Sequence, residues 1–225
     1  MIIIIRGHIR NSFEDNRLYN MIRDLTLMTN VKVYIHTWSI IRSSLSWRKI
    51  QEDKRETNEI MIRTYFRDMA CYIKHIIIDD DSKIELIGNL KGNINGGPCP
   101  IKAWKNYWYG QYRIIDFIKR QSEIDDSLKL EPVLNTRFDL FSNSNNVAPP
   151  IVTKFALELK DKEFDRNVFL RKQACNGIDN LIIGNLHTQY KLIQNFHYNL
   201  DNLIKQLPHT INQERLVFFL NEIIF

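Results

Sequence analysis

Short apolar runs alternate with segments of helical spacing over the first 141 residues, and this alternation constrains the fold more than any other feature. The runs are Ile2–Ile5, Val31–Trp38, Tyr72–Ile78 and the stretch Pro132–Phe141. A strand that lies parallel to its predecessor needs a long crossover, usually a helix. The order strand, helix, strand, helix, strand, helix, strand therefore predicts an α/β fold, a single domain whose mainly parallel central sheet is flanked by helices.

Local signals refine this prediction. Ser12 and Asp15 are spaced as a capping box ahead of the first helix. The residues Ile84–Ile87, Ile151–Leu159 and Leu181–Ile183 are expected as further short strands, and two helices are expected to close the chain. The polar loop Ser142–Pro150 predicts a boundary between two halves of one compact domain, residues 1–141 and 142–225.

Composition limits the class of ligand. The chain has 225 residues and a net charge of +5 without a long Lys/Arg run, so no nucleic acid partner is expected. A polyanionic small molecule would explain the same charge. No apolar run approaches the ~20 residues of a transmembrane segment. The cysteines Cys71, Cys99 and Cys175 lack metal-ligand spacing and indicate free thiols in a reducing, cytoplasmic compartment.

Polar residues follow the first two apolar runs. Arg6, Gly7, His8 and Arg10 come directly after the first, where an open α/β sheet forms a crevice for ligands. The full glycine-rich dinucleotide motif is missing, so the cationic side chains are expected to bind phosphate instead. His36 and Trp38 end the second run, either as a packed aromatic pair or as part of the same site.

Two sets of acidic residues are candidates for binding a metal. Arg137 and Asp139, two apart, share one face of a strand, so they could hold a phosphate and a divalent cation, or simply form an ion pair. Asp79 and Asp81 form a D-x-D sequence that fits either a solvated turn or a metal site.

Taken together, these segments resemble the GT-A nucleotide-sugar glycosyltransferases, in particular small transferases of bacterial surface-polysaccharide loci and large DNA viruses. The resemblance is carried by Ile3–Arg10, Ile35–Trp38, Arg137–Asp139 and Gly177–Gly184. It implies a GT-A-like fold and an enzyme that moves a hexose or pentose from a nucleotide-diphosphate sugar, with UDP as the expected nucleotide, to a glycan or other hydroxyl acceptor. The protein would be cytoplasmic, or virus-encoded and present in host cytoplasm or virion.

The resemblance also implies roles for residues. In such enzymes a D-x-D motif at a central strand holds Mn²⁺ or Mg²⁺ on the donor diphosphate. Here the equivalent sequence is Arg137-Phe138-Asp139, so either Asp139 ligates the metal with waters and phosphate oxygens, or Arg137 replaces part of that coordination. Residues 1–141 would hold the donor and residues 142–225 the acceptor. The expected donor-binding residues are Arg6, Gly7, His8, Arg10, His36, Trp38, Trp108, Arg137 and Asp139.

An inverting transfer also needs a carboxylate to take the proton of the acceptor hydroxyl. Asp179 is the first candidate, followed by Glu214 and the acids at 79–81, although Asp179 also fits a turn before a strand. Two alternatives stay open. One is another α/β transferase, such as a nucleotidyltransferase or a sulfotransferase, and the other is a non-catalytic module that binds a nucleotide sugar.

Overall fold

The computed structural model describes residues 1–46, 50–142, 147–173, 176–206 and 213–225. Its centre is a six-stranded sheet with the order β5-β2-β1-β6-β8-β7. These strands are β1 (Ile2–Arg6), β2 (Lys32–Trp38), β5 (Ile73–Asp79), β6 (Pro132–Arg137), β7 (Val168–Gln173) and β8 (Asn176–Asn185). The first four run parallel, whereas β8 is antiparallel to β6 and to β7. The predicted α/β fold with a mainly parallel central sheet is confirmed.

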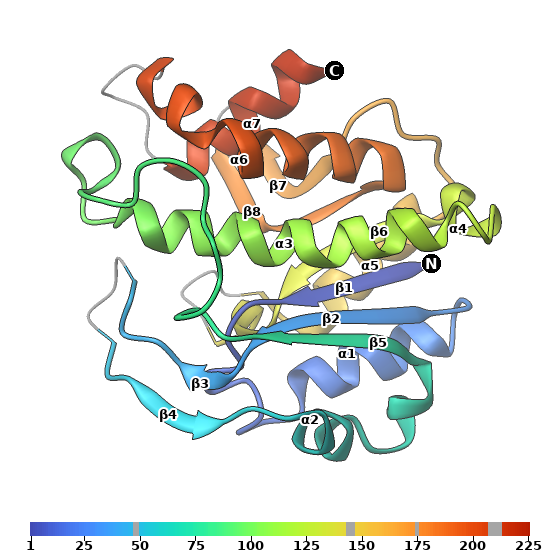
Figure 1. Cartoon of the computed structure of the whole chain (residues 1–225). Coiled ribbons are helices and arrows are strands. Elements are labelled where there is room, and N and C mark those ends of the chain that lie inside the picture. Colours follow the sequence, from blue (N-terminus) through green and yellow to red (C-terminus); the bar gives the residue numbers. More distant parts are fainter. Residues whose placement is uncertain (47–49, 143–146, 174–175, 207–212) are drawn as a thin grey trace.

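Helices cover both faces of this sheet (Figure 1). One face packs on α1 (Arg17–Thr26), α2 (Glu59–Phe66) and α5 (Pro149–Leu159). The other packs on α3 (Ile101–Gln121), α6 (Leu186–Gln206) and α7 (Gln213–Ile224). The smaller elements are β3 (Ile40–Arg42), β4 (Asp53–Glu56), α4 (Ser127–Leu130) and the 3₁₀ turns η1 (Arg67–Tyr72), η2 (Ile94–Gly96) and η3 (Phe138–Leu140). In the described parts of the chain, no helix has the length and apolar character needed to cross a membrane.

Strand β1 shows why its four isoleucines form an unbroken run. It lies between β2 and β6, and its side chains alternate between two separate cores. Ile2 and Ile4 pack toward α3, while Ile3 and Ile5 pack toward α1, and all four are fully buried. Each such side chain contributes roughly 1.5–3 kcal/mol of burial free energy, so a polar residue is disfavoured on either face.

The connections create a switch point between β1 and β6. Helices α1 and α2 cross on one face as the sheet grows from β1 to β2 and β5. Helix α3 then crosses the opposite face and returns the chain to β6, on the other side of β1. In open α/β sheets, the carboxyl ends of the strands at such a reversal form a crevice that receives ligands.

Residues 151–159 are helical, so the predicted strand there is wrong. Pro149 and Pro150 occupy the first positions of α5, where a missing backbone N–H costs nothing. Val152 and Ala156, one helical turn apart, are fully buried against α1. A run of β-branched residues favoured a strand locally, but packing of one helical face against α1 determined the outcome.

Two other local predictions are corrected. The first helix begins at Arg17 behind Asn16, and the side chain of Asp15 accepts from Arg17 N (2.8 Å) instead of closing a capping box with Ser12. Residues 84–87 form no strand, and the carbonyl of Ile87 accepts from Lys105 Nζ.

The segment after β2 contains the antiparallel pair β3 and β4. Trp47 and Arg48 within it lie outside the described residues, as does Cys175, while Cys71 and Cys99 are free thiols.

The two halves of the chain share one sheet. Strand β6 from the first half pairs with β8 from the second, from Pro132 opposite Asn185 to Thr136 opposite Leu181. The predicted strand at 181–183 is therefore part of a longer element, and its partner β7 was not predicted. This pairing places the start of β8 beside the carboxyl end of β6, at the edge where the switch point lies.

Candidate functional site

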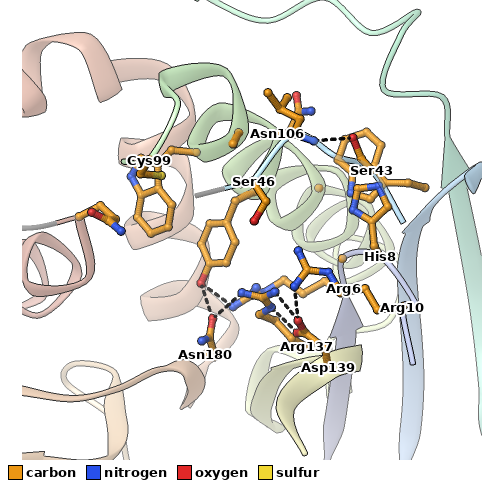
Figure 2. Close-up of a pocket in the computed structure, with 18 of the residues that line it drawn as sticks. Arg6, His8, Arg10, Ser43, Ser46, Cys99, Asn106, Arg137, Asp139 and Asn180 are labelled. Atoms are coloured by element: carbon orange, nitrogen blue, oxygen red, sulfur yellow. Dashed lines mark hydrogen bonds and ion pairs between the residues drawn. The ribbon is translucent and has the colours of Figure 1, made fainter. Parts of the chain in front are cut away.

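One row of side chains crosses the sheet at the switch point. The register places Arg6 opposite His36 on β2 and opposite Arg137 on β6. Residues opposite each other in a parallel pair point to the same face, here the face covered by α3. A pocket opens above this row (Figure 2). The sequence-predicted residues that line it are Arg6, Gly7, His8, Arg10, His36, Trp38, Arg137, Asp139, Asp179 and Glu214.

Gly7 turns the chain out of β1 and into the pocket wall. Its φ of +91° lies in the left-handed region, while a Cβ there would meet no atom within 4 Å. The backbone conformation is thus what requires glycine. Gly7 N donates to the carbonyl of His36 (3.1 Å), and Thr37 Oγ1 donates to the carbonyl of Gly7 (3.0 Å). These bonds attach the turn to β2.

Arg6 is a buried cation at the floor of the pocket, with 2% of its surface exposed. Its Nε donates to Asn135 Oδ1 (2.8 Å), and its Nη2 donates to the hydroxyl of Tyr107 (2.9 Å). The Asn135 amide donates in turn to Gln111 and Gln189 (3.3 Å each). Within the described chain, no carboxylate lies within 4.0 Å of its guanidinium. Burial lowers the pKa of Arg6, which indicates that the site holds a cation at a desolvation cost.

Arg10 and Arg137 hold the carboxylate of Asp139 between them (Figure 2). Asp139 lies in the turn η3, just beyond the end of β6. Its Oδ2 accepts from Arg10 Nη1 (2.6 Å) and Arg137 Nη2 (2.7 Å), while its Oδ1 lies 2.7 Å from Arg137 Nε. Arg137 Nη1 also donates to Asn180 Oδ1 (3.3 Å). Both ends of the predicted Arg-Phe-Asp sequence therefore contact each other.

These residues do not fit a divalent cation. A Mn²⁺ or Mg²⁺ ion needs about six ligands, mainly oxygens, and both Asp139 oxygens lie within 2.7 Å of guanidinium nitrogens. The alternative ligand Asp79 contacts His36 Nε2 (3.2 Å) and Arg113 Nε (3.1 Å), and neither it nor Asp81 lines the pocket. Among the described residues, no group of three or more His, Cys, Asp or Glu could hold a metal.

Asp179 is a buried carboxyl group of this pocket. It lies at the start of β8 with 6% of its surface exposed. Burial raises its pKa to about 6, the negative charge of Glu214 on α7 adds to this, and Arg137 and Arg6 oppose it. A carboxyl group with a pKa near 6 is partly ionised at neutral pH and can accept a proton there. The two predicted catalytic acids therefore face the same pocket.

In both histidines of the pocket, burial disfavours the protonated form. Burial lowers the pKa of His8 to about 3, with Arg10 adding to the effect, and burial also lowers the pKa of His36. His36 Nε2 donates to Asp79, and a Cβ at position 110 would lie 2.6 Å from the His36 ring, so α3 approaches closely because residue 110 is glycine. His8 stacks on Trp38 with ring centroids 5.8 Å apart.

Trp108 is not part of the pocket, which corrects the expectation that it contacts a donor. It is fully buried on the inner face of α3 and stacks on Phe196 of α6, with ring centroids 3.9 Å apart and planes 4° apart. Trp104 and Tyr107, from the same helix, line the pocket instead. Trp104 and Trp108 are one helical turn apart, and their spacing alone does not tell which of them faces a core and which a cavity. The packing of α3 on α6 determines this.

Several functional candidates were missed from the sequence. Tyr107, Asn135 and Asn180 position the guanidiniums of Arg6 and Arg137. Burial raises the pKa of Tyr107 to about 12, so its hydroxyl stays protonated. Asn135 carried a usable signal, because it interrupts the apolar stretch of a strand buried on both faces, where a polar side chain needs hydrogen-bond partners.

Replacing Trp108 with alanine is expected to lower the free energy of unfolding by about 3–5 kcal/mol, because a large buried ring and its stacking contact are removed. Urea denaturation measures this loss. The matched control is Ile124→Ala, which removes an apolar side chain that is 85% exposed and should stay within about 0.5 kcal/mol of the parent. Equal effects of the two changes would contradict a core position for Trp108.

Comparison with known proteins adds no assignment: no protein-family model matches this chain, and no curated protein matches it by sequence. The pocket itself is therefore the basis for assigning a function.

Proposed function

We propose that this protein is a GT-A-like glycosyltransferase that moves a sugar from a nucleotide-diphosphate sugar to a hydroxyl group of a glycan or similar acceptor. The observation that carries the proposal is the meeting of three arginines with a carboxyl group of pKa about 6 in one pocket at the switch point of the sheet. The arginines supply positive charge for a diphosphate, and the carboxyl group supplies a base.

The donor is expected to lie with its diphosphate toward the guanidiniums of Arg6, Arg10 and Arg137. Guanidinium groups match phosphate oxygens with paired hydrogen bonds. They also neutralise the charge that develops on a departing nucleoside diphosphate, which lowers the barrier to transfer.

The acceptor is expected on the side of Asp179 and Glu214, which the second half of the chain supplies. In an inverting transfer the acceptor oxygen forms a bond to the anomeric carbon while the bond from that carbon to the phosphate oxygen breaks. The hydroxyl proton passes to the Asp179 carboxylate, and the bonding electrons leave with the nucleoside diphosphate. The pocket thus offers a carboxylate for the proton and guanidiniums for the negative charge on the nucleoside diphosphate.

A panel of nucleotide sugars tests this proposal. The matching donor, present at ~100 times its dissociation constant, should stabilise the protein by about 2.7 kcal/mol in a thermal-shift assay. Addition of acceptor glycans should then release nucleoside diphosphate. Binding without hydrolysis or transfer would favour the non-catalytic module, and formation of a new phosphodiester would favour a nucleotidyltransferase.

Arg6→Ala should weaken donor binding about ten- to a hundredfold, because a charge-assisted hydrogen bond contributes about 1.5–3 kcal/mol. Calorimetric titration measures the affinity, at a temperature where the variant is folded. Arg120→Ala is the matched control, since that exposed guanidinium pairs with Asp116 on the outer surface of α3. Unchanged affinity in Arg6→Ala would refute its assignment to the donor site.

A further inference from the structure

The arrangement of Arg10, Asp139 and Arg137 gives Asp139 a different role from that of a metal ligand. The two arginines come from opposite sides of the switch point, one after β1 and one at the end of β6. They meet at a single carboxylate whose side chain is 4% exposed. The contacts of 2.6 and 2.7 Å to Oδ2, with 2.7 Å to Oδ1, bring two guanidinium groups together that would otherwise repel each other.

The charges around this cluster favour an anion. Arg6 lies beside Arg137 in the register of β1 and β6 and contributes a third guanidinium, held by the neutral groups of Asn135 and Tyr107. Among the described residues, the pocket lining as a whole has three guanidiniums and three carboxyl groups, but Asp179 and Glu214 belong to β8 and α7, so Asp139 is the carboxylate that pairs directly with the guanidiniums at the β6 end. A divalent cation placed at Asp139 would lie next to two guanidiniums in a poorly solvated site, where like charges repel most strongly. A diphosphate placed there would be attracted by all three guanidiniums.

We propose that the three arginines form a metal-independent diphosphate site, in which Asp139 is the internal counter-ion that positions Arg10 and Arg137. The identity of the ligand as a nucleoside diphosphate rests on the proposed function, whereas the anion site itself rests on the geometry. Each guanidinium carries five N–H donors in a planar fork, so it can contact a carboxylate and a phosphate oxygen together.

This role reverses the expected effect of changing Asp139. If Asp139 were a metal ligand, Asp139→Asn would abolish Mn²⁺-dependent binding. As a counter-ion, its charge competes with the diphosphate for the same guanidiniums. The amide that this substitution introduces keeps the size of the side chain and a carbonyl oxygen for the arginines but removes the competing charge. Binding of a diphosphate should then become tighter.

Calorimetric titration with inorganic pyrophosphate and with UDP, each in EDTA and in Mn²⁺, separates the two roles. The parent protein should bind both ligands in EDTA. Asp139→Asn should tighten binding in EDTA about three- to tenfold, and Arg137→Gln should weaken it at least about tenfold, as expected for loss of a charge-assisted contact. Arg10→Gln, in the loop that follows β1, is the second variant should Arg137→Gln fail to fold. Arg120→Gln, which also removes one half of an Arg–Asp pair, should bind like the parent.

The outcomes are distinct. Binding that appears only with Mn²⁺ and is lost in Asp139→Asn would overturn the inference and return Asp139 to the metal. Absence of pyrophosphate binding under both conditions would overturn it as well. Tight pyrophosphate binding in EDTA, together with no response to any nucleotide sugar, would support the anion site while refuting the glycosyltransferase.

Discussion

Asp179→Asn is expected to lower the turnover number of sugar transfer by about 10²–10⁴-fold, the usual contribution of a general base, with little change in donor affinity. The amide keeps the size of the side chain but cannot accept the acceptor proton. Asp179 is suited to this role because it is buried and because its raised pKa of about 6 lies close to neutral pH. Steady-state release of nucleoside diphosphate measures turnover, and calorimetric titration measures affinity.

The pH profile gives a second readout of the same change. Since the ionised carboxylate is the active form, turnover of the parent protein should rise with pH through about 6. Glu214→Gln should move this midpoint to lower pH, because the charge of Glu214 raises the pKa of Asp179. Asp126→Asn, at an 87% exposed carboxylate, is the control that should keep both rate and profile. A turnover of Asp179→Asn within about tenfold of the parent would exclude Asp179 as the base.

The same substitution is expected to stabilise the folded protein at neutral pH. The pKa of Asp179 is about 6 in the folded chain and 3.8 as its ordinary value, so the folded state holds the proton more tightly. Stability from this group is fully present below pH 3.8 and is lost as the pH rises to about 6. This difference between the two pKa values corresponds to about 3 kcal/mol of folding free energy, since each pKa unit corresponds to about 1.36 kcal/mol.

Urea denaturation of the parent and of Asp179→Asn at several pH values tests this expectation. The free energy of unfolding should favour the variant by about 3 kcal/mol more at pH 8 than at pH 3, because the amide cannot ionise in its buried position. Comparing the two proteins at each pH cancels the titration of other groups. A difference that stays constant with pH would show that Asp179 has an ordinary pKa and would weaken its assignment as the base. Asp179→Asn is thus expected to lower turnover but to raise the free energy of unfolding, as is typical of a site where function requires a buried charge.

The strand ends were the most predictable part of the site. Arg6, His36 and Arg137 each lie at the end of an apolar run, and parallel strands bring their carboxyl ends to the same edge of the sheet. Their placement in one pocket follows from these two facts. Asp179 and Glu214 are candidates by their chemistry alone. They line the pocket because β8, which carries Asp179, pairs with β6, and because α7, which carries Glu214, packs on the same face of the sheet.

The errors have a common cause. Residues 151–159 and Trp108 both have local patterns that fit two environments. Residues 151–159 form a helix because they pack against α1, and Trp108 lies in the core because it packs against α6. Those partners lie far away in the sequence, so no local window contains the information.

The amino-acid sequence by itself determined the α/β class, the four parallel strands and the polar character of their carboxyl ends, because hydrophobic periodicity and chain connectivity are local properties. Only the tertiary structure decided which charges meet. Arg10 and Asp139 are 129 residues apart and lie 2.6 Å from each other, so the carboxylate that the sequence suggested as a metal ligand pairs with two arginines. Such pairings depend on strand order and register, which are set by the packing of the whole sheet between its two layers of helices.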